Sequence, residues 1–358
     1  MKILIGKHCG FCFGVKRAVE LAEREAESGT VYTYGNIIHN ESVVDELRTK
    51  GIIPVQSVSD VSEGDTLIIR AHGVPPEVIK SCDEKGVSVV DATCPFVKRI
   101  HRLVERASGE CRKVFIVGKA DHPEVIGIRG YAGPDAAVLQ TVRDVESVTP
   151  VERGCVVAQT TMTQARYAEI VEALRKKCGD LAVYETICDT TRLRQAEAKT
   201  IAEKSDRVYV IGSRNSANTA RLAEICRSRC KVTETLENTE NFSLAKLQSD
   251  DIIGIVAGAS TPDRMIMEVI EGMSEQEKTT IETIEAEAPA EEVVATAEPA
   301  KDPEEVTVQV SEEAPASEAK SNDEAVEAKA EPQEEDNSDF AKAFEKTLTR
   351  IHHGQWIT

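Results

Sequence analysis

The sequence predicts an α/β fold in which three related units, each with a small parallel sheet, surround a central pocket with pseudo-three-fold symmetry. Two observations indicate it: short apolar strands alternate with helical patterns over residues 1–275, and one such unit occurs three times. Composition limits the fold to this part, because residues 276–338 are rich in Glu, Ala and Pro and hold no aromatic residue. We expect that segment to be a disordered acidic linker.

Each copy of the repeat begins with a cysteine that precedes a helical pattern, and the helix leads to a strand that ends in a glycine. The pairs lie 23, 24 and 24 residues apart and are Cys12 with Gly35, Cys94 with Gly118, and Cys188 with Gly212. A third strand in each copy leads into the next cysteine, and the N-terminal strand within residues 1–11 does this for the first. The units are therefore expected at about residues 12–93, 94–187 and 188–275.

Polar residues follow the strands at matching positions. A histidine or a serine stands four residues beyond each glycine: His39, His122 and Ser216. After a second strand in each copy stands another histidine or hydroxyl residue: His72, Thr160 with Thr161, and Ser260. Because ligands bind beyond the carboxyl ends of parallel strands, we expect these side chains to line one pocket.

The three repeat cysteines suit an iron–sulfur cluster better than a zinc ion. Zinc sites mostly use closely spaced pairs and four ligands, whereas three thiolates from separate strands suit a 4Fe–4S cluster with one open iron. Three unrelated buried thiols are the alternative, which the matched spacing disfavours. Cys9 and Cys12 form a C-x-x-C, so a redox dithiol is open, but only Cys12 fits the repeat and we interpret Cys9 as a small core residue.

A second set of residues is suited to binding a phosphate or diphosphate: His39, His72, Ser216, Asn218 and Ser260. Three of them precede helices, whose N-terminal N–H groups attract anions, although each alone would more often be a helix cap. Glu124 follows His122 at the start of a predicted helix. It is either a first-turn carboxylate or, beside an open iron, a general acid whose proton Thr160 or Thr161 orients.

Nine ordered motifs within residues 1–275 resemble the 4-hydroxy-3-methylbut-2-enyl diphosphate reductase family, also called IspH or LytB. They are GFCFGVKRAV, YGNIIHN, RAHGV, DATCPFV, GKADHPEV, QTTMT, TICDTTRLRQ, GSRNSANT and AGASTP. The resemblance implies reductive dehydroxylation of (E)-4-hydroxy-3-methylbut-2-enyl diphosphate to isopentenyl and dimethylallyl diphosphate, the last step of the non-mevalonate isoprenoid pathway.

By the same resemblance, Cys12, Cys94 and Cys188 bind one 4Fe–4S cluster, and the substrate hydroxyl binds its open iron. Glu124 supplies protons, with support from His122 and from Thr160 or Thr161. The diphosphate is held by His39, His72, Ser216, Asn218 and Ser260. Ferredoxin or flavodoxin delivers the electrons, since the sequence has no nucleotide-binding glycine loop. Ala217 stands where some members have a second serine, which puts one hydroxyl contact in question.

Two other functions stay open on the sequence alone. An open-iron hydro-lyase would use the same cluster without net electron transfer, and a non-enzymatic adaptor would bind RNA or the ribosome through the C-terminal region. Residues 339–358 resemble the start, or a remnant, of an RNA-binding OB-fold repeat, and some family members are fused to such repeats. We expect no nucleic-acid binding by the core.

The net charge of −19 belongs to the tail, because residues 271–340 hold 23 Asp and Glu against 4 Lys. No apolar run is long enough to span a bilayer, and the N-terminus has no signal-peptide pattern. We therefore expect a cytoplasmic protein without membrane partners.

Overall fold

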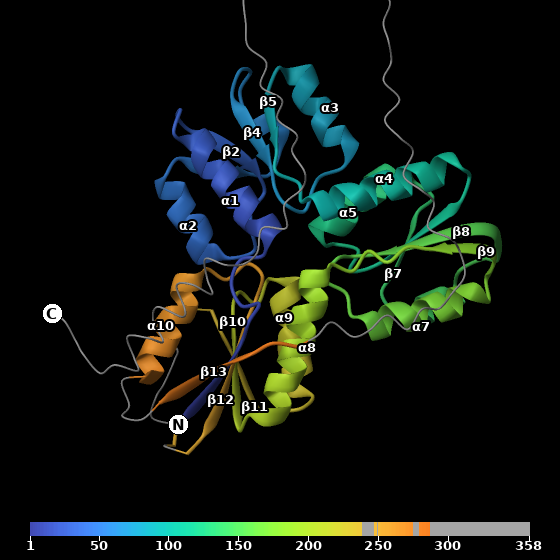
Figure 1. Cartoon of the computed structure of the whole chain (residues 1–358). Coiled ribbons are helices and arrows are strands. Elements are labelled where there is room, and N and C mark those ends of the chain that lie inside the picture. The colour runs from blue at the N-terminus through green and yellow to red at the C-terminus, as the bar shows by residue number, and fades with distance from the viewer. Residues whose placement is uncertain (238–246, 249, 275–278, 287–358) are drawn as a thin grey trace, which may run out of the picture.

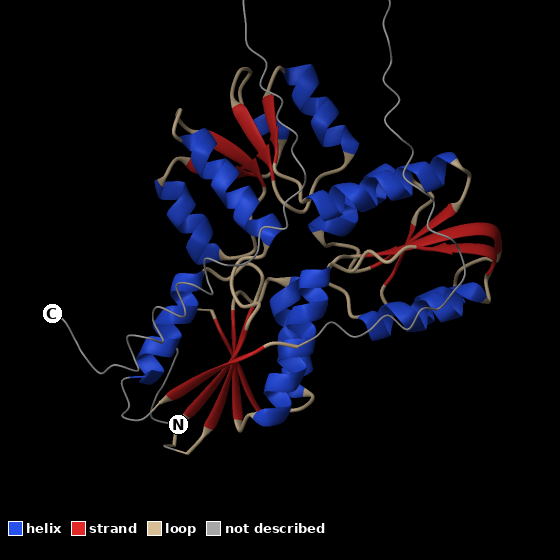
Figure 2. Ribbon diagram, viewed as in Figure 1, coloured by secondary structure: helices blue, strands red, loops and turns tan. Residues whose placement is uncertain are grey.

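Three α/β lobes surround one centre in the computed structural model, which describes residues 1–237, 247–248, 250–274 and 279–286 (Figures 1 and 2). Each lobe contains one sheet, and every strand pair in the described residues is parallel. The predicted fold class is confirmed. No helix in this part of the chain is long and apolar enough to cross a membrane.

The first lobe has a four-stranded sheet in the order β3-β2-β4-β5. Its strands are β2 (Val31–Tyr34), β3 (Ile52–Val55), β4 (Thr66–Ile69) and β5 (Ser88–Asp91). One face is covered by α1 (Phe13–Ala26) and α2 (Glu41–Thr49), and the other by α3 (Pro76–Lys85), near the short 3₁₀ helix η1 (Val58–Asp60). Both faces are apolar because neighbours such as Leu67 and Ile68 point to opposite sides of the sheet.

The second lobe repeats this plan with the order β7-β6-β8-β9. Its strands are β6 (Lys113–Val117), β7 (Ala137–Leu139), β8 (Val151–Ala158) and β9 (Cys178–Val183). Helices α4 (Pro95–Gly109) and α5 (Pro123–Ala132) cover one face, and α7 (Gln164–Arg175) with the short α6 (Val142–Glu146) covers the other. The continuous apolar run of β6 follows from burial on both faces.

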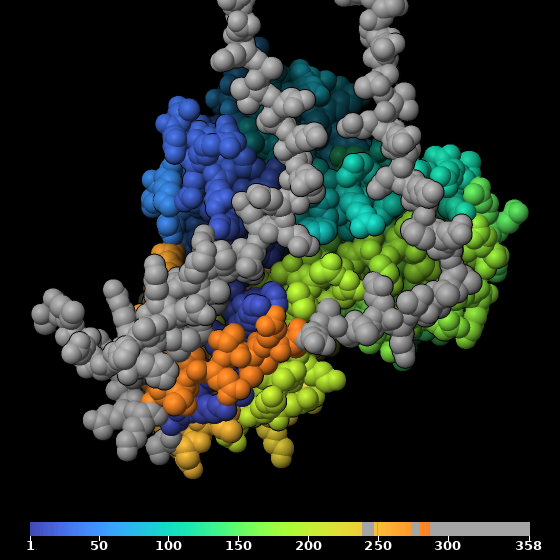
Figure 3. All heavy atoms as spheres, in the orientation of Figure 1, coloured from blue at the N-terminus to red at the C-terminus, as the bar shows by residue number. Residues whose placement is uncertain are grey.

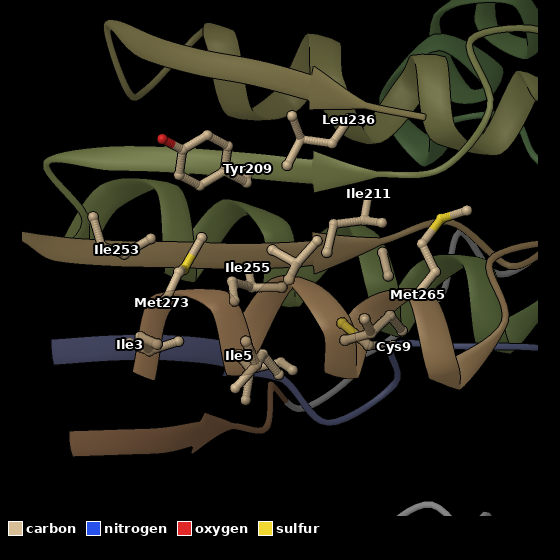
Figure 4. Packing of buried hydrophobic residues seen from close by; sticks show 14 residues of the cluster. Ile3, Ile5, Cys9, Tyr209, Ile211, Leu236, Ile253, Ile255, Met265 and Met273 are labelled. Carbon is tan, nitrogen blue, oxygen red and sulfur yellow. The ribbon is translucent and has the colours of Figure 1, made fainter. Parts of the chain in front are cut away.

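The third lobe has five strands in the order β11-β10-β12-β1-β13. They are β1 (Lys2–Gly6), β10 (Arg207–Ile211), β11 (Val232–Leu236), β12 (Ile252–Ala257) and β13 (Thr280–Ile284). Helix α10 (Asp263–Ser274) covers one face, while α8 (Asp189–Lys204) and α9 (Ala217–Arg227) cover the other. Figure 4 shows the first of these faces, where Ile3 and Ile5 of β1 lie near Met265 and Met273 of α10.

The lobes are joined through equivalent strands. β5 precedes α4, β9 precedes α8 and β1 precedes α1, so each repeat cysteine lies between a strand of one sheet and the first helix of the next lobe. The N-terminal strand therefore belongs to the third sheet, where it lies between β12 and β13.

Four strands were not predicted. β3, β7 and β11 each form one edge of a sheet, and none of them leads to a cysteine, glycine or polar residue of the repeat. β13 lies in the segment expected to be linker, so the core extends past residue 275: residues 280–284 pair with β1, and Ile284 is buried. Figure 3 shows these residues, in orange, beside the blue N-terminal ones. The rest of the expected linker and the expected OB-fold segment, residues 339–358, lie outside the described residues.

The burial of Ile284 predicts that β13 stabilises the third lobe. Ile284→Ala leaves a cavity against α8 and β1 and is expected to cost about 2 kcal/mol of unfolding free energy. A drop of about 5 °C in the thermal midpoint should follow. Thr283→Ala, an exposed change in the same strand, is the control. Equal midpoints for the two variants would mean that β13 contributes no stability.

Candidate active site

The loops at the carboxyl ends of the three sheets meet in one central cavity. It is lined by every site residue predicted from the sequence, namely Cys12, Cys94, Cys188, His39, His72, His122, Glu124, Thr160, Thr161, Ser216, Asn218 and Ser260. These side chains come from all three lobes. The cavity is therefore a product of the assembled fold and of no single unit.

The three cysteines occupy the same structural position. Cys12, Cys94 and Cys188 are the N-cap residues of α1, α4 and α8, and none of the thiols caps its helix through a side-chain hydrogen bond. Each backbone N–H donates to a carbonyl in the loop after the third strand of the preceding lobe: to Ala259 (3.1 Å), Ala71 (3.0 Å) and Thr160 (3.1 Å). Three helix N-termini thus point at one place and favour negative charge there.

The thiols lie close enough to affect one another. Burial raises the pKa of Cys94 to about 12, and the charges of Cys12 and Cys188 add to this effect. Burial also raises the pKa of Cys188. Space beside them is limited, because a Cβ on Gly14 would lie 2.7 Å from the Sγ of Cys94. Three thiols that converge at helix N-termini suit a metal group, which would hold them as thiolates.

Cys9 belongs to the core. Its side chain lies among the apolar residues between the third sheet and α10, near Met265 (Figure 4), and it does not line the cavity. Burial is the main cause that raises its pKa to about 12, and the negative charge of Glu197 acts in the same direction. These observations favour the small core residue over a redox dithiol with Cys12.

Three histidines cluster on another wall of the cavity. The ring centres of His39, His72 and His122 are 4.7, 5.5 and 5.7 Å apart. Burial lowers the pKa of each ring, that of His122 to about 4, and the Arg70 guanidinium lowers all three further. The rings are therefore neutral near pH 7.

The ring nitrogens of this cluster are available to a ligand. His122 Nδ1 accepts a hydrogen bond from the backbone N–H of Glu124 (3.2 Å), so its Nε2 carries the proton in the neutral ring. His39 Nε2 and His72 Nδ1 are buried and have no hydrogen-bond partner in the described structure. One nitrogen from each ring lies within 4.8 Å of the others, which would also suit a metal ion. The nearby Arg70 cation favours an anion instead.

The neighbouring wall is polar and incompletely paired. Asn218 lies in the first turn of α9, inside the helix and not in the preceding loop, and neither atom of its buried amide has a partner in the described residues. Ser216 caps the same helix by accepting from the Thr219 N–H (3.4 Å). Ser260 Oγ donates to the His39 carbonyl (3.3 Å). Because buried polar atoms are almost always paired, this wall indicates a polar ligand.

Glu124 is a buried carboxyl group with two close partners. It is 2% exposed in the first turn of α5. One oxygen accepts from the Thr160 backbone N–H (2.6 Å) and the other from the Thr160 hydroxyl (2.7 Å). Burial raises its pKa, whereas the two Thr160 bonds oppose that rise. Of the two predicted threonines, Thr160 bonds the carboxylate, while Thr161 accepts from Gln159 (2.9 Å).

Three residues near the cavity were not predicted. Arg70 follows β4 and packs its guanidinium against Gly35, whose φ of +69° also excludes a side chain. Asn40 donates from its amide to the Ser260 carbonyl (3.0 Å) and so joins the first lobe to the third. Arg194 lines the cavity from α8. Arginine and asparagine are common surface residues, and their spacing along the chain carried no signal.

Comparison with known proteins gives consistent matches. The profile of the LytB protein family matches residues 3–274. A 4-hydroxy-3-methylbut-2-enyl diphosphate reductase from Thermoanaerobacter sp. (strain X514) is 42% identical over 274 residues, which cover 75% of this chain and 95% of that protein.

Two solved structures are also similar to this chain. One is (E)-4-hydroxy-3-methyl-but-2-enyl diphosphate reductase, described as the terminal enzyme of the non-mevalonate pathway, with 40% identity and a TM-score of 0.59 over 77% of this chain and 99% of that one. The other is the E-1-hydroxy-2-methyl-but-2-enyl-4-diphosphate reductase from Plasmodium falciparum, with 27% identity and a TM-score of 0.75 over 81% and 94%.

The position of Arg70 predicts a contribution to anion binding. Arg70→Met removes a half-buried positive charge behind the histidines and is expected to weaken the binding of inorganic diphosphate about tenfold, or 1.4 kcal/mol, by calorimetry. Lys80→Met is the control, because this side chain is 77% exposed and its charge is screened by water. If the two variants bind diphosphate equally well, the Arg70 charge does not act on the cavity.

Proposed function

The chain belongs to the LytB family of 4-hydroxy-3-methylbut-2-enyl diphosphate reductases, and from this membership we propose how its central cavity carries out the reaction. The protein is an oxidoreductase that removes the hydroxyl group of (E)-4-hydroxy-3-methylbut-2-enyl diphosphate in the last step of the non-mevalonate pathway. Isopentenyl and dimethylallyl diphosphate are the products. The observation that supports the proposal is one cavity with three thiols, an anion-binding wall and a buried acid.

We propose that Cys12, Cys94 and Cys188 hold one 4Fe–4S cluster. The family is one of iron–sulfur enzymes, and the three thiols converge from equivalent N-cap positions at helix N-termini. A cluster with three protein ligands supplies electrons and one open iron that acts as a Lewis acid. The chain itself contributes the fixed positions of the thiols, through the three backbone hydrogen bonds described above.

We propose that the diphosphate binds to the wall formed by His39, His72, Ser216, Asn218 and Ser260. The neutral rings and the amide of Asn218 can donate hydrogen bonds, and their buried atoms have no other partner in the described residues. The N-terminus of α9 adds favourable backbone dipoles. A bound anion would raise the pKa of the histidines and strengthen their hold on it.

Glu124 is proposed as the general acid. Burial keeps a proton on this carboxyl group at a higher pH than usual, so it can protonate the departing hydroxyl group, which leaves as water. Thr160 fixes both carboxyl oxygens, and His122 accepts the Glu124 N–H and fixes the start of the helix. The second proton is delivered to the allylic carbon skeleton, and two electrons complete the balance.

The electrons are proposed to come from a small redox protein, either ferredoxin or flavodoxin. The sequence offers no glycine-rich loop for a nicotinamide or flavin nucleotide, so an external donor fits best. A cytoplasmic location remains a prediction. The adaptor hypothesis concerns the C-terminal segment outside the described residues, and the matched residues 3–274 support the enzyme.

The reductase and the hydro-lyase differ in their need for electrons. We expect anaerobic turnover only with a reductant such as reduced ferredoxin. Cys94→Ser should lose this turnover, together with most of the bound iron and the EPR signal. Cys111→Ser changes an exposed cysteine in the turn after α4; it is the control and should match the wild type. Product formed without any electron donor would identify a hydro-lyase.

Substitutions at Glu124 and Thr160 test the proton donor. Glu124→Gln keeps the size of the side chain but cannot donate a carboxyl proton, and kcat should fall at least about 100-fold with unchanged iron content. Thr160→Val removes one hydrogen bond that stabilises the carboxylate, so the pKa of Glu124 rises. Enzyme activity falls when Glu124 loses its proton, so this fall should occur at a higher pH in the Thr160→Val pH–rate profile than in that of the wild type. A Glu124→Gln enzyme with near wild-type kcat would exclude this role.

A further inference from the structure

Arg194 is a buried cation in the wall of the cavity that holds the three cysteines. It lies in α8, the helix that begins after Cys188, and is 2% exposed. One guanidinium nitrogen, Nη2, donates to the Gly10 carbonyl (2.9 Å). Its Nε and Nη1 are buried and have no hydrogen-bond partner in the described residues. Arg194 thus lines the cavity and carries two buried charged donors without a partner in this part of the chain.

The carboxylates nearest to Arg194 do not neutralise it by direct pairing. Glu197, one turn further along α8, is bound to His8, whose Nδ1 lies 2.6 Å from one oxygen and whose N–H donates to the other (3.1 Å). Asp263 lies against Gly10, and burial raises its pKa even though the Lys16 and Arg194 charges oppose this. No ion pair of Arg194 is present in the part of the chain that the structure describes. A buried cation without a counter-charge is unfavourable.

The proposed cluster would supply that counter-charge. Three cysteine thiolates make a 4Fe–4S group anionic, and one added electron makes it more so. Hydrogen bonds to the sulfurs and nearby charge are the main means by which a protein sets the potential of such a group. We propose that Arg194 sets the reduction potential of this site: its free N–H groups and its charge stabilise the reduced state. The inference depends on the proposed three-cysteine cluster.

Arg194 also has a structural role that must be separated from the electrostatic one. Its bond to Gly10 and the bonds of Glu197 to His8 fasten the loop that carries Cys12 to the helix that carries Cys188. Glu197 does not line the cavity. Glu197→Gln therefore weakens the loop attachment without removing the cation from the cavity and is the matched control.

The test is an anaerobic redox titration of the reconstituted, full-length enzyme, followed by EPR, with iron content measured for each variant. In Arg194→Gln we expect the ratio of reduced to oxidised cluster at a fixed potential to fall at least tenfold, a shift of 59 mV to a more negative midpoint for one electron. Arg194→Lys keeps the charge but loses the guanidinium geometry, so its shift should be smaller. Glu197→Gln removes a negative charge and keeps the cation, so its midpoint should not become more negative than that of the wild type.

Two outcomes would overturn the proposal. The first is an Arg194→Gln enzyme with full iron content and the wild-type midpoint. The second is a negative shift of the same size in Glu197→Gln, which would assign the effect of Arg194 to loop attachment alone. A wild-type protein that binds no cluster would instead refute the proposed function, before any variant is measured.

Discussion

A single backbone hydrogen bond, made three times, determines the geometry of the whole site. Each repeat cysteine donates its N–H to the loop after the third strand of the preceding lobe, so one lobe fixes the ligand that opens the next. The bond joins the carboxyl edge of one sheet to the N-terminus of the following helix. Since the three connections close in a circle, each lobe is held by its two neighbours. The same three loops also carry His72, Thr160, Thr161 and Ser260 of the cavity.

The electrostatics of the cavity are consistent with two anionic occupants. Burial and Arg70 keep His39, His72 and His122 neutral but able to donate hydrogen bonds, which suits a diphosphate. On the thiol side, Arg194 and three helix N-termini suit an anionic metal group. Glu124 lies in the same cavity as both sets, and its burial favours the protonated form. The site therefore combines positive potential for its ligands with one acid that avoids adding negative charge.

Much of the fold and of the cavity could be predicted from the sequence because the repeat has regular spacing. Equal distances from cysteine to glycine predicted three similar units, and parallel strands place their carboxyl ends together, so the twelve site residues could be assigned to one cavity. The edge strands were missed because no residue of the repeat pattern follows them, and β13 was missed because it contains only Ile281 and Ile284 as apolar residues. Arg70 and Arg194 were not predicted because the burial of a charged side chain can be recognised only when its surroundings are known. The choice between Thr160 and Thr161 likewise required the position of the Glu124 oxygens.

The place of β1 in the third sheet has a consequence for biosynthesis. Strand β1 precedes the rest of the core in the sequence, yet it pairs with β12 and β13, which are among the last parts of the core to be made. The loop that carries Cys12 is therefore unanchored until nearly the whole core has been translated, whereas the first two sheets can form earlier. The complete three-cysteine site can therefore form only after β12 and β13 have been made, which places its maturation late in the synthesis of the core.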